Sequence, residues 1–519
     1  MSFKEIAKKN DLKNGEMKSF KIDDKEVLLC RIKDEFFAVG AYCTHYGAPI
    51  EEGILKGDTI ICPWHHSWFN AKSGKLMEPP AMDSLPKYEI KTEGDSETID
   101  LTGKIESHMV KKDIKSDKRT FVILGAGASS FSAAKSMREN GFRGNIIMIT
   151  EEDKKPYDRP NLSKDYLAGN AKPEWMPLRP DEFYDDYGIE LKLKMTIKNV
   201  DFKKKVIGLG NGENLKYDKL LIATGGIPRR LEVPGAELKN IFYLRSFKDA
   251  DEIINAVNNS KKAVIVGASF IAMETAHSLT ERKINVTVVA PDAVPFERIF
   301  GKEIGYLFQK EHEKTGTTFK LKSGVKKFIG DDRVKAVLLE SGEEIETDFV
   351  VIGIGVKPST QFISGIKLLD DGSIKTDAYL QVEEDVYASG DIATFPDYRS
   401  DNHMRIEHWR LAEQHGRMAG ANMTGKKIKY EGVPFFWTAQ AGMTLGYVGH
   451  IKKWDDIIID GDISQKKFIT YYIKDNKILA AAGINRDKEL AAVHILMKEN
   501  KLPDTEKLRT KSFNILSLI

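Results

Sequence analysis

Short apolar runs separated by turn residues fill the first part of the chain. Runs at residues 26–31 and 35–39 flank a turn at Lys33 and Asp34, and Gly, Asn and Asp residues recur as far as Gly74. Short strands with frequent turn residues predict a small all-β domain. Residues 104–118 are polar and rich in lysine, show no apolar periodicity and are predicted to form a linker.

A different pattern begins after this linker. Apolar runs at residues 120–124 and 263–266 each lead into a glycine-containing turn and then into small and apolar residues. This order predicts two units in which a buried strand is followed by a helix. From about residue 432 the pattern returns to short strands and ends with a predicted helix near residues 489–498. The predicted fold class is therefore multidomain, α/β plus β.

Composition narrows the possible partners and compartments. The 519 residues carry a formal net charge of +2 with both signs mixed, so we expect no nucleic-acid partner. No apolar run reaches about 18 residues, so no membrane span is predicted. The charged N-terminus lacks a signal region. The three cysteines fit a reducing compartment and predict a cytoplasmic protein, with Cys30 a buried hydrophobic residue in an apolar run.

Four residues in the first domain have the spacing of metal ligands. Cys43-Thr-His45 is followed, sixteen residues later, by Cys62-Pro-Trp-His65. Two thiolates and two imidazoles from two loops suit a [2Fe–2S] centre of the Rieske type, in which the cysteines hold one iron and the histidines hold the other. Four-coordinate zinc could use the same ligands, so both metals stay open at this point.

A nucleotide-binding turn follows the first strand of the second domain. It reads Gly125-x-Gly127-x-x-Ser130, where glycines permit a tight turn and let backbone N–H groups approach a pyrophosphate. The next predicted strand ends at Glu151 and Glu152, either of which could accept hydrogen bonds from a ribose. The combination predicts a dinucleotide site.

The first domain resembles Rieske ferredoxins in its Cys-Thr-His-x-Gly-Ala-Pro and Cys-Pro-Trp-His motifs. The high-potential members of that family have two further cysteines that clip the ligand loops together, and Ala48 and Trp64 stand at those positions here. The resemblance implies that Ser67 donates a hydrogen bond to a cluster sulfur. His66 replaces a usual glycine. It could tune the centre or point to solvent, and we expect it to point to solvent.

The remaining chain resembles the family of apoptosis-inducing factor and ferredoxin reductases. The segment Pro-Tyr-Asp-Arg-Pro-Asn-Leu-Ser-Lys at residues 156–164 is similar to a family segment that contacts FAD, and residues 223–229 are similar to a crossing strand that does so. A Gly-Asp segment at residues 390–391 resembles the one that binds the flavin ribityl chain. The resemblance implies FAD contacts at Arg159, Lys164, Thr224, Arg229, Asp391, Glu407, His408 and Trp437.

An inserted second nucleotide unit is implied to bind NAD(P)H. Its turn carries Gly267 and Ser269, and the family's Glu on the following helix is Glu274, which we expect to pair with Lys164 as the catalytic pair. Gly355 lies in a turn similar to the family's nicotinamide turn. Asp292 is the remaining acid after the second strand of this unit, and no basic residue directly follows that strand, so NADH is favoured over NADPH.

The resemblance covers almost the whole chain and implies a division into domains. The chain has no C-x₄-C pair, and this excludes the dithiol flavoenzymes. The implied domains are an all-β Rieske domain (1–103), a linker (104–118), an FAD-binding domain in two parts (119–244 and 377–431) split around a Rossmann-like NAD(P)H-binding domain (245–376), and a C-terminal α+β reductase domain (432–519).

The predicted function is an NAD(P)H-dependent flavoprotein oxidoreductase. Electrons would pass from NAD(P)H through FAD to the Rieske centre, and His45 and His65 would hold the iron nearer solvent, where an acceptor could dock. The expected partners are a nicotinamide nucleotide and an electron-acceptor protein or small molecule, with a monomer or homodimer as the assembly. The alternative is a redox-responsive interaction protein with slow NADH oxidation.

Overall fold

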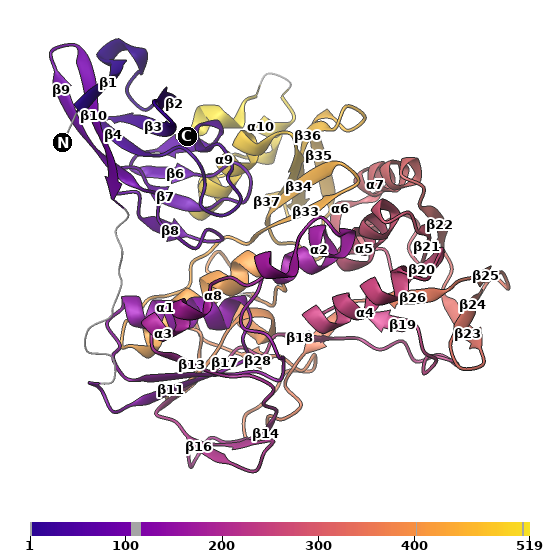
Figure 1. The fold of residues 1–519 in the computed structure, drawn as a ribbon. Coiled ribbons are helices and arrows are strands. Elements are labelled where there is room, and N and C mark those ends of the chain that lie inside the picture. The colour runs from indigo at the N-terminus through magenta and orange to yellow at the C-terminus, as the bar shows by residue number, and fades with distance from the viewer. Residues whose placement is uncertain (1–2, 105–115, 401, 511–512) are drawn as a thin grey trace. The chain divides into compact units, whose positions relative to one another are not determined.

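The computed structural model describes residues 3–104, 116–400, 402–510 and 513–519 (Figure 1). These residues form two compact units. The first joins the chain up to Lys104 with Gly432–Trp437 and Leu445–Ile519, and the second joins residues 116–431 with Thr438–Thr444. Most of the predicted linker, residues 105–115, lies outside the described residues. Within the described part of the chain, we find no helix with the length and apolar content needed to cross a membrane.

The N-terminal part of the first unit is all-β, as predicted. Strand β3 explains its layering, because Leu28 and Cys30 belong to one hydrophobic core while Val27 and Leu29 belong to another. Alternate side chains of a strand point to opposite faces, so the apolar stretch at residues 27–30 of this strand is covered on both sides. One sheet has the order β1 (Phe3–Lys8), β10 (Ser96–Lys104), β9 (Lys87–Glu93), β4 (Glu35–Gly40), β3 (Lys25–Ile32), β2 (Met17–Ile22), and the other β5 (Ile54–Lys56), β6 (Thr59–Ile61), β7 (Trp68–Asn70), β8 (Leu76–Glu78).

The C-terminal part of the chain forms an antiparallel sheet and helices. Its buried core includes Ile54 and Ile61 from the N-terminal strands, packed with Phe435, Val448 and Leu496. One continuous core therefore joins the N-terminal and C-terminal parts of the first unit. The sheet has the order β33 (Phe435–Gln440), β34 (Met443–Gly449), β37 (Lys477–Ile484), β36 (Lys467–Lys474), β35 (Asp456–Asp462), and the helices are α9 (Asp487–Lys498) and α10 (Thr505–Leu508).

The second unit contains the predicted pair of Rossmann-like sheets. In the first sheet the strands are parallel except for the edge strand β29. Its order is β13 (Ile189–Lys192), β12 (Asn145–Ile149), β11 (Thr120–Leu124), β17 (Lys219–Ile222), β30 (Val386–Ala388), β29 (Gln381–Glu383). Helices α1 (Ala128–Glu139) and α8 (Trp409–Met423) pack side by side against it.

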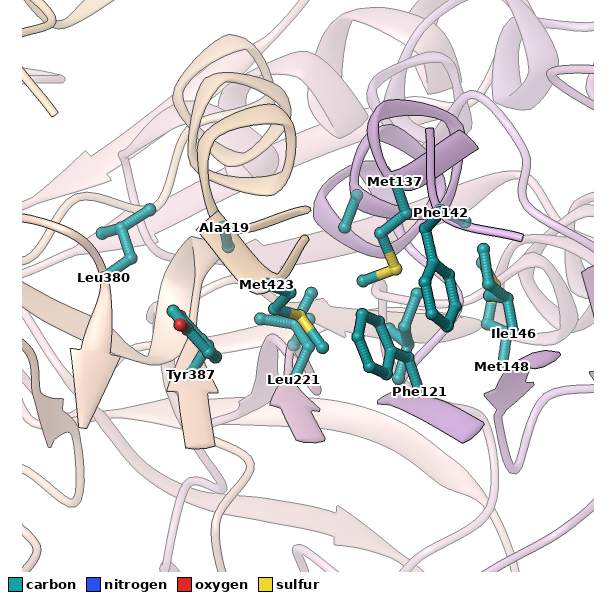
Figure 2. Packing of buried hydrophobic residues seen from close by; sticks show 14 of the residues in the cluster. Phe121, Met137, Phe142, Ile146, Met148, Leu221, Leu380, Tyr387, Ala419 and Met423 are labelled. Carbon is teal, nitrogen blue, oxygen red and sulfur yellow. The ribbon is translucent and has the colours of Figure 1, made fainter. Parts of the chain in front are cut away.

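Large side chains fill the space between this sheet and these helices. Figure 2 shows Phe121 and Leu221 of the sheet beside Met137 of α1 and Met423 of α8. Phe121 also stacks on Phe142, with ring centroids 3.8 Å apart. Because α8 comes late in the chain, this core joins two segments that are separated by the inserted domain, as the predicted split requires.

The inserted domain has a parallel sheet of its own. The order is β19 (Ile241–Tyr243), β26 (Phe349–Ile352), β20 (Lys262–Val266), β21 (Asn285–Ala290), β22 (Thr318–Leu321), with helices α4 (Phe247–Val257), α5 (Phe270–Glu281) and α7 (Lys302–Lys314). Two short strands, β18 (Gly226–Pro228) and β27 (Val356–Pro358), pair where the chain passes between the two nucleotide domains. Antiparallel sheets β14 (Ile197–Asp201), β15 (Val206–Leu209), β16 (Asn214–Lys216) and β23 (Val325–Gly330), β24 (Val334–Leu339), β25 (Glu344–Glu346) complete this unit's larger elements.

Candidate functional site

Two loops of the first unit carry the predicted metal ligands. The first metal loop, residues 43–48, is closed by Cys43, whose N–H donates to the carbonyl of Ala48 at 2.9 Å. The second metal loop, residues 62–67, connects β6 to β7 and is closed by Cys62, whose N–H donates to the carbonyl of Ser67 at 2.9 Å. Each loop is therefore fixed by its own backbone at the base.

The four ligand side chains meet as two pairs. His45 Nδ1 and His65 Nδ1 lie 3.0 Å apart, and the thiols of Cys43 and Cys62 share a hydrogen bond. Among the described residues, no three Cys, His, Asp or Glu side chains converge on a point where one metal ion could sit. A pair of thiolates and a separate pair of imidazoles suit the two irons of a Rieske centre. They suit a single tetrahedral zinc ion poorly.

The thiol pair has a polarised environment. The hydrogen bond from Cys62 lowers the pKa of Cys43, and the same contact together with burial raises the pKa of Cys62. The Ser67 hydroxyl also hydrogen-bonds to Cys43, as expected for a residue that donates to sulfur. The third cysteine, Cys30, is buried as predicted, and burial raises the pKa of its thiol to about 12.

Aromatic rings lie beside both predicted histidine ligands. The ring of Trp437 lies 4.1 Å from that of His65 and 5.8 Å from that of His45, measured between centroids. Tyr46 stacks on His45 at 3.9 Å. His65 is only 7% exposed and His45 is partly exposed, and the placing of their iron nearer solvent, where an acceptor could dock, stays a prediction. Burial also lowers the pKa of His45 to about 4.

The expectation that His66 points to solvent is wrong. Its side chain is fully buried, its Nδ1 lies 2.8 Å from Nδ1 of His494, and its ring stacks on Phe435 at 4.0 Å. Both contacts come from the C-terminal part of the chain, far away in sequence, so local pattern could not indicate them. The loop is therefore held from outside as well as by its own backbone.

The first nucleotide turn in the second unit has the shape that a pyrophosphate needs. Gly125 has φ +107°, and a Cβ there would lie 2.3 Å from the carbonyl oxygen of Ala223. A Cβ on Gly127 would meet nothing within 4 Å, which leaves open space at the start of α1. The Ser130 hydroxyl is buried and has no partner among the described residues. An open cradle with a spare donor fits the pyrophosphate of FAD.

The charged residues expected around the FAD interact in a chain. Arg159 donates to Glu152 at 2.6 Å and to the carbonyl of Arg245 at 2.6 Å. Arg245 donates in turn to Asp391 at 2.8 Å. Glu152, which also accepts from the Tyr157 hydroxyl, is thereby held in place, whereas Glu151 is exposed. Of the two predicted acids, only Glu152 takes part in this chain of interactions, and ribose binding by either acid stays a prediction.

Other predicted FAD contacts have structural partners of their own. The Thr224 hydroxyl donates to the carbonyl of Ser359 at 2.6 Å. Glu407 pairs with Arg405, and burial raises the pKa of the Glu407 carboxyl. His408 is the residue before α8 begins. Their positions at strand ends and at a helix N-terminus are those from which side chains or backbone N–H groups reach a nucleotide.

Glu274 is the centre of a buried hydrogen-bond network. Lys164 donates to its Oε2 at 2.8 Å, so the predicted pair is present, and the Ser163 hydroxyl donates to the same oxygen at 2.6 Å. The Thr438 hydroxyl donates to Oε1 at 2.7 Å. Gln440 Nε2 donates to Thr438 at 2.8 Å, which continues the network along β33.

The network ends at a histidine on the inserted domain. His312 Nε2, on α7, lies 2.8 Å from Gln440 Oε1, which can only accept, so His312 donates. Burial lowers the pKa of His312 to about 4, consistent with a neutral ring. The bonds from His312, Gln440 and Thr438 all point toward the Glu274 carboxylate, which fixes its orientation toward Lys164.

The predicted NAD(P)H residues lie at the expected strand ends. Gly267 has φ +115°, and a Cβ there would lie 2.4 Å from the carbonyl oxygen of Gly353, so only glycine fits this turn; Ser269 is exposed at the start of α5. Asp292 forms an ion pair with Arg298 at 2.9 Å. Arg229, predicted to touch FAD, donates its backbone N–H to the carbonyl of Gly355 at 2.9 Å and so ties the two turns together.

Sequence reasoning missed several residues of this site. Arg245 could have been noticed because Ser246 and Asp249 form the capping box of α4 directly after it. No local sequence signal marks Thr438, Gln440 or His312. The Thr438–Glu274 and Gln440–His312 contacts each join segments more than 100 residues apart.

Comparison with known proteins agrees with this organisation. The chain matches family models described as Pyridine nucleotide-disulphide oxidoreductase (residues 119–416), Rieske [2Fe-2S] domain (residues 2–89) and Reductase C-terminal (residues 435–519). It is 34% identical to apoptosis-inducing factor 3 of Homo sapiens, over 93% of this chain and 82% of that protein. Rhodocoxin reductase of Rhodococcus erythropolis is 32% identical over 74% of this chain and 90% of that protein.

Solved structures give the same result. The putidaredoxin reductase–putidaredoxin complex matches with a TM-score of 0.73 and 28% identity, over 77% of this chain and 98% of that chain. The ferredoxin reductase of the CYP199A2 system from Rhodopseudomonas palustris matches with the same TM-score and identity, over 77% of this chain and 100% of that chain. The chain therefore belongs to the pyridine nucleotide-disulphide oxidoreductase family, as an FAD- and NAD(P)H-dependent reductase of the ferredoxin-reductase type that carries an N-terminal Rieske [2Fe–2S] domain similar to that of apoptosis-inducing factor 3.

Proposed function

We propose that this enzyme passes electrons from NAD(P)H through FAD to its own Rieske [2Fe–2S] centre and then to an external acceptor protein or small molecule. We also propose that the chain is divided into Rieske, FAD-binding, NAD(P)H-binding and C-terminal domains at the boundaries predicted from its sequence. In the putidaredoxin reductase complex, a similar reductase is paired with a separate protein. Here a Rieske domain is part of the same chain, which supports an internal first acceptor.

The two bound groups would supply complementary electron chemistry, since FAD takes up a hydride and releases electrons singly while a Rieske centre accepts one electron at a time. The chain's own residues do the positioning. Lys164 brings a fixed cation to the place where negative charge develops, and Glu274 holds that cation through the 2.8 Å ion pair. Ser163 and Thr438 keep the Glu274 carboxylate from turning away.

The contact between Trp437 and the two histidine ligands is the observation that carries the proposal. Trp437 corresponds to the family's aromatic residue beside the flavin, and its ring packs against His65 at 4.1 Å and His45 at 5.8 Å in the first unit. The next residue in the chain, Thr438, donates to Glu274 in the second unit. Two consecutive residues of the chain thus contact the predicted cluster ligands and the Glu274 network, which supports electron transfer within the chain.

Asp292 supports NADH as the electron donor. A carboxylate at the end of the second strand can accept hydrogen bonds from ribose hydroxyls and repels a 2′-phosphate. Among the described residues, Arg298 is the basic side chain that pairs with Asp292, at 2.9 Å, and the ion pair engages its positive charge. We therefore expect NADH to be used in preference to NADPH.

Anaerobic titration of the purified holoenzyme with NADH tests this function. We expect NADH to bleach the flavin absorbance and then to generate the electron paramagnetic resonance (EPR) signal of a reduced Rieske centre. His45→Ala removes one predicted iron ligand, so it should abolish the signal while NADH still bleaches the flavin. Full flavin reduction with an oxidised cluster in the unaltered enzyme would contradict the proposal.

A further inference from the structure

His66 has an unusual backbone and environment for a residue in a ligand loop. It lies between the iron ligand His65 and the sulfur-bonding Ser67, has φ +54° and is fully buried. Side chains with a Cβ rarely adopt left-handed backbone conformations, and a buried imidazole needs hydrogen-bond partners. The loop therefore keeps this histidine in an unfavourable backbone conformation, which requires compensating contacts.

The C-terminal domain supplies those contacts. His494, which is 1% exposed in the middle of α9, shares the 2.8 Å hydrogen bond between the two Nδ1 atoms. Phe435 of β33 covers the His66 ring at 4.0 Å with the planes 20° apart. Trp68, the first residue after the loop, packs against His494 at 5.4 Å. Helix α9 and strand β33 thus hold the second metal loop through His494 and Phe435.

Ion pairs flank this buried contact. Lys56 of β5 pairs with Glu499 at 2.8 Å, and Glu78 of β8 pairs with Lys498 at 3.6 Å. These pairs are partly exposed and are expected to contribute little by themselves. They also lie outside the ligand loop, so they provide a way to weaken the same interface without touching His66.

The ligand loops themselves lack a covalent connection. Ala48 and Trp64 stand where related high-potential domains have clipping cysteines, and all three cysteines of the chain, which lie in the described part, are free. The second metal loop is tied at its base by the Cys62 to Ser67 bond. Its outer part, at residues 65–66, is contacted instead by Trp437, Phe435 and His494.

We propose that His494 is a positioning residue for the Rieske centre, and that its hydrogen bond to His66 takes the place of the missing disulfide clip. By holding His66, it fixes the orientation of His65 on one side and Ser67 on the other. The C-terminal domain then acts as part of the cluster site. This role depends only on the loop holding the Rieske centre and is independent of whether electrons arrive from the flavin.

Variants at His494 test this role in the holoenzyme. His494→Leu removes the hydrogen bond and His494→Gln retains a donor and an acceptor. We measure the EPR spectrum and midpoint potential after reduction by dithionite, which bypasses NADH and the flavin, and backbone hydrogen exchange of residues 62–67. His494→Leu should shift or broaden the EPR spectrum, change the midpoint potential and speed hydrogen exchange in the loop roughly 10-fold or more. His494→Gln should largely restore the spectrum and the midpoint potential.

Glu499→Gln serves as the matched control, because it weakens a flanking ion pair and should leave the cluster spectrum unchanged. If His494→Leu does not fold, His66→Gly tests the same bond, since glycine accepts the left-handed backbone and cannot bond to His494. An unaltered spectrum, potential and loop exchange in whichever of these two variants folds would overturn the proposal. So would a spectrum in Glu499→Gln as altered as in His494→Leu.

Discussion

The indole of Trp437 packs on the imidazole of His65, with ring centroids 4.1 Å apart and planes tilted by 45°. His65 is one of the two histidines placed to hold the outer iron of a Rieske centre. In free ferredoxins of this type we expect that edge to meet a separate partner, whereas here a residue of the same chain covers it. The proposed function therefore uses the histidine edge for electron entry, and the departure of electrons would need another route or a change in this contact.

Removing the Lys164 cation should slow hydride transfer. Lys164→Met deletes the ammonium that Glu274 holds at 2.8 Å, so we expect the rate of flavin reduction by NADH to fall roughly 10- to 100-fold. Stopped-flow absorbance under anaerobic conditions measures this rate. Lys205→Ala is the control, because it breaks an ion pair with Asp385 of comparable length that has no predicted cofactor contact. Equal rates in Lys164→Met and the unaltered enzyme would exclude this role.

The Thr438 hydroxyl should matter more than its methyl group. Thr438→Val keeps the shape but removes the donor to Glu274, so the carboxylate loses one of its three donors and we expect flavin reduction to slow roughly 3- to 10-fold. Thr438→Ser keeps the hydroxyl and should stay near the unaltered rate. The same stopped-flow assay compares them, and a serine variant as slow as the valine variant would show that only packing is involved.

The neutral state of His312 predicts a dependence of stability on pH. Burial lowers its pKa from 6.5 to about 4. The unfolded chain therefore binds more protons than the folded one between these values, so the stabilisation is complete above pH 6.5 and is lost as the pH falls toward 4. The neighbouring His277, whose pKa burial also lowers, acts in the same direction.

His312→Gln should reduce this loss, because glutamine can still donate to Gln440 and does not titrate. Thermal unfolding midpoints at pH 7 and pH 5 measure the effect. We expect a smaller fall in the midpoint for His312→Gln than for the unaltered protein, with a difference of up to about 2 kcal/mol in unfolding free energy at pH 5. Parallel pH profiles for the two proteins would show that His312 does not stay neutral in the folded state.

Asp292 should set the choice between nicotinamide nucleotides. In the unaltered enzyme we expect kcat/KM to favour NADH. Asp292→Ala removes a ribose acceptor and releases Arg298, which is 81% exposed on its side chain, toward a 2′-phosphate. The ratio of kcat/KM for NADH to that for NADPH should then fall roughly 10-fold. A preference for NADPH in the unaltered enzyme would refute this assignment.

The fold was largely readable from the sequence, because it follows from local patterns. The apolar runs of β3, β11 and β20 and the glycine turns after the latter two are features of adjacent residues. The Lys164–Glu274 pair was also predicted, but only through resemblance to a family, since nothing local joins residues 110 positions apart.

The errors arose where distant segments meet. His66 was expected in solvent because a polar residue in a loop usually lies there, yet α9 brings His494 to it from 428 residues away. Trp437 likewise reaches His65 from a distant part of the chain, which no local pattern indicates. Thr438 donates to Glu274 from 164 positions away in the chain. Such contacts depend on tertiary packing, which hydrophobic periodicity does not encode.

Internal electron transfer is tested most directly by the concentration dependence of cluster reduction. The holoenzyme is mixed anaerobically with one equivalent of NADH at protein concentrations spanning roughly 100-fold, and the Rieske EPR signal is followed by rapid freezing. Transfer within one chain predicts a rate constant that does not change with protein concentration and that falls in Trp437→Leu. A rate proportional to protein concentration, or a cluster that stays oxidised after the flavin is reduced, would contradict it.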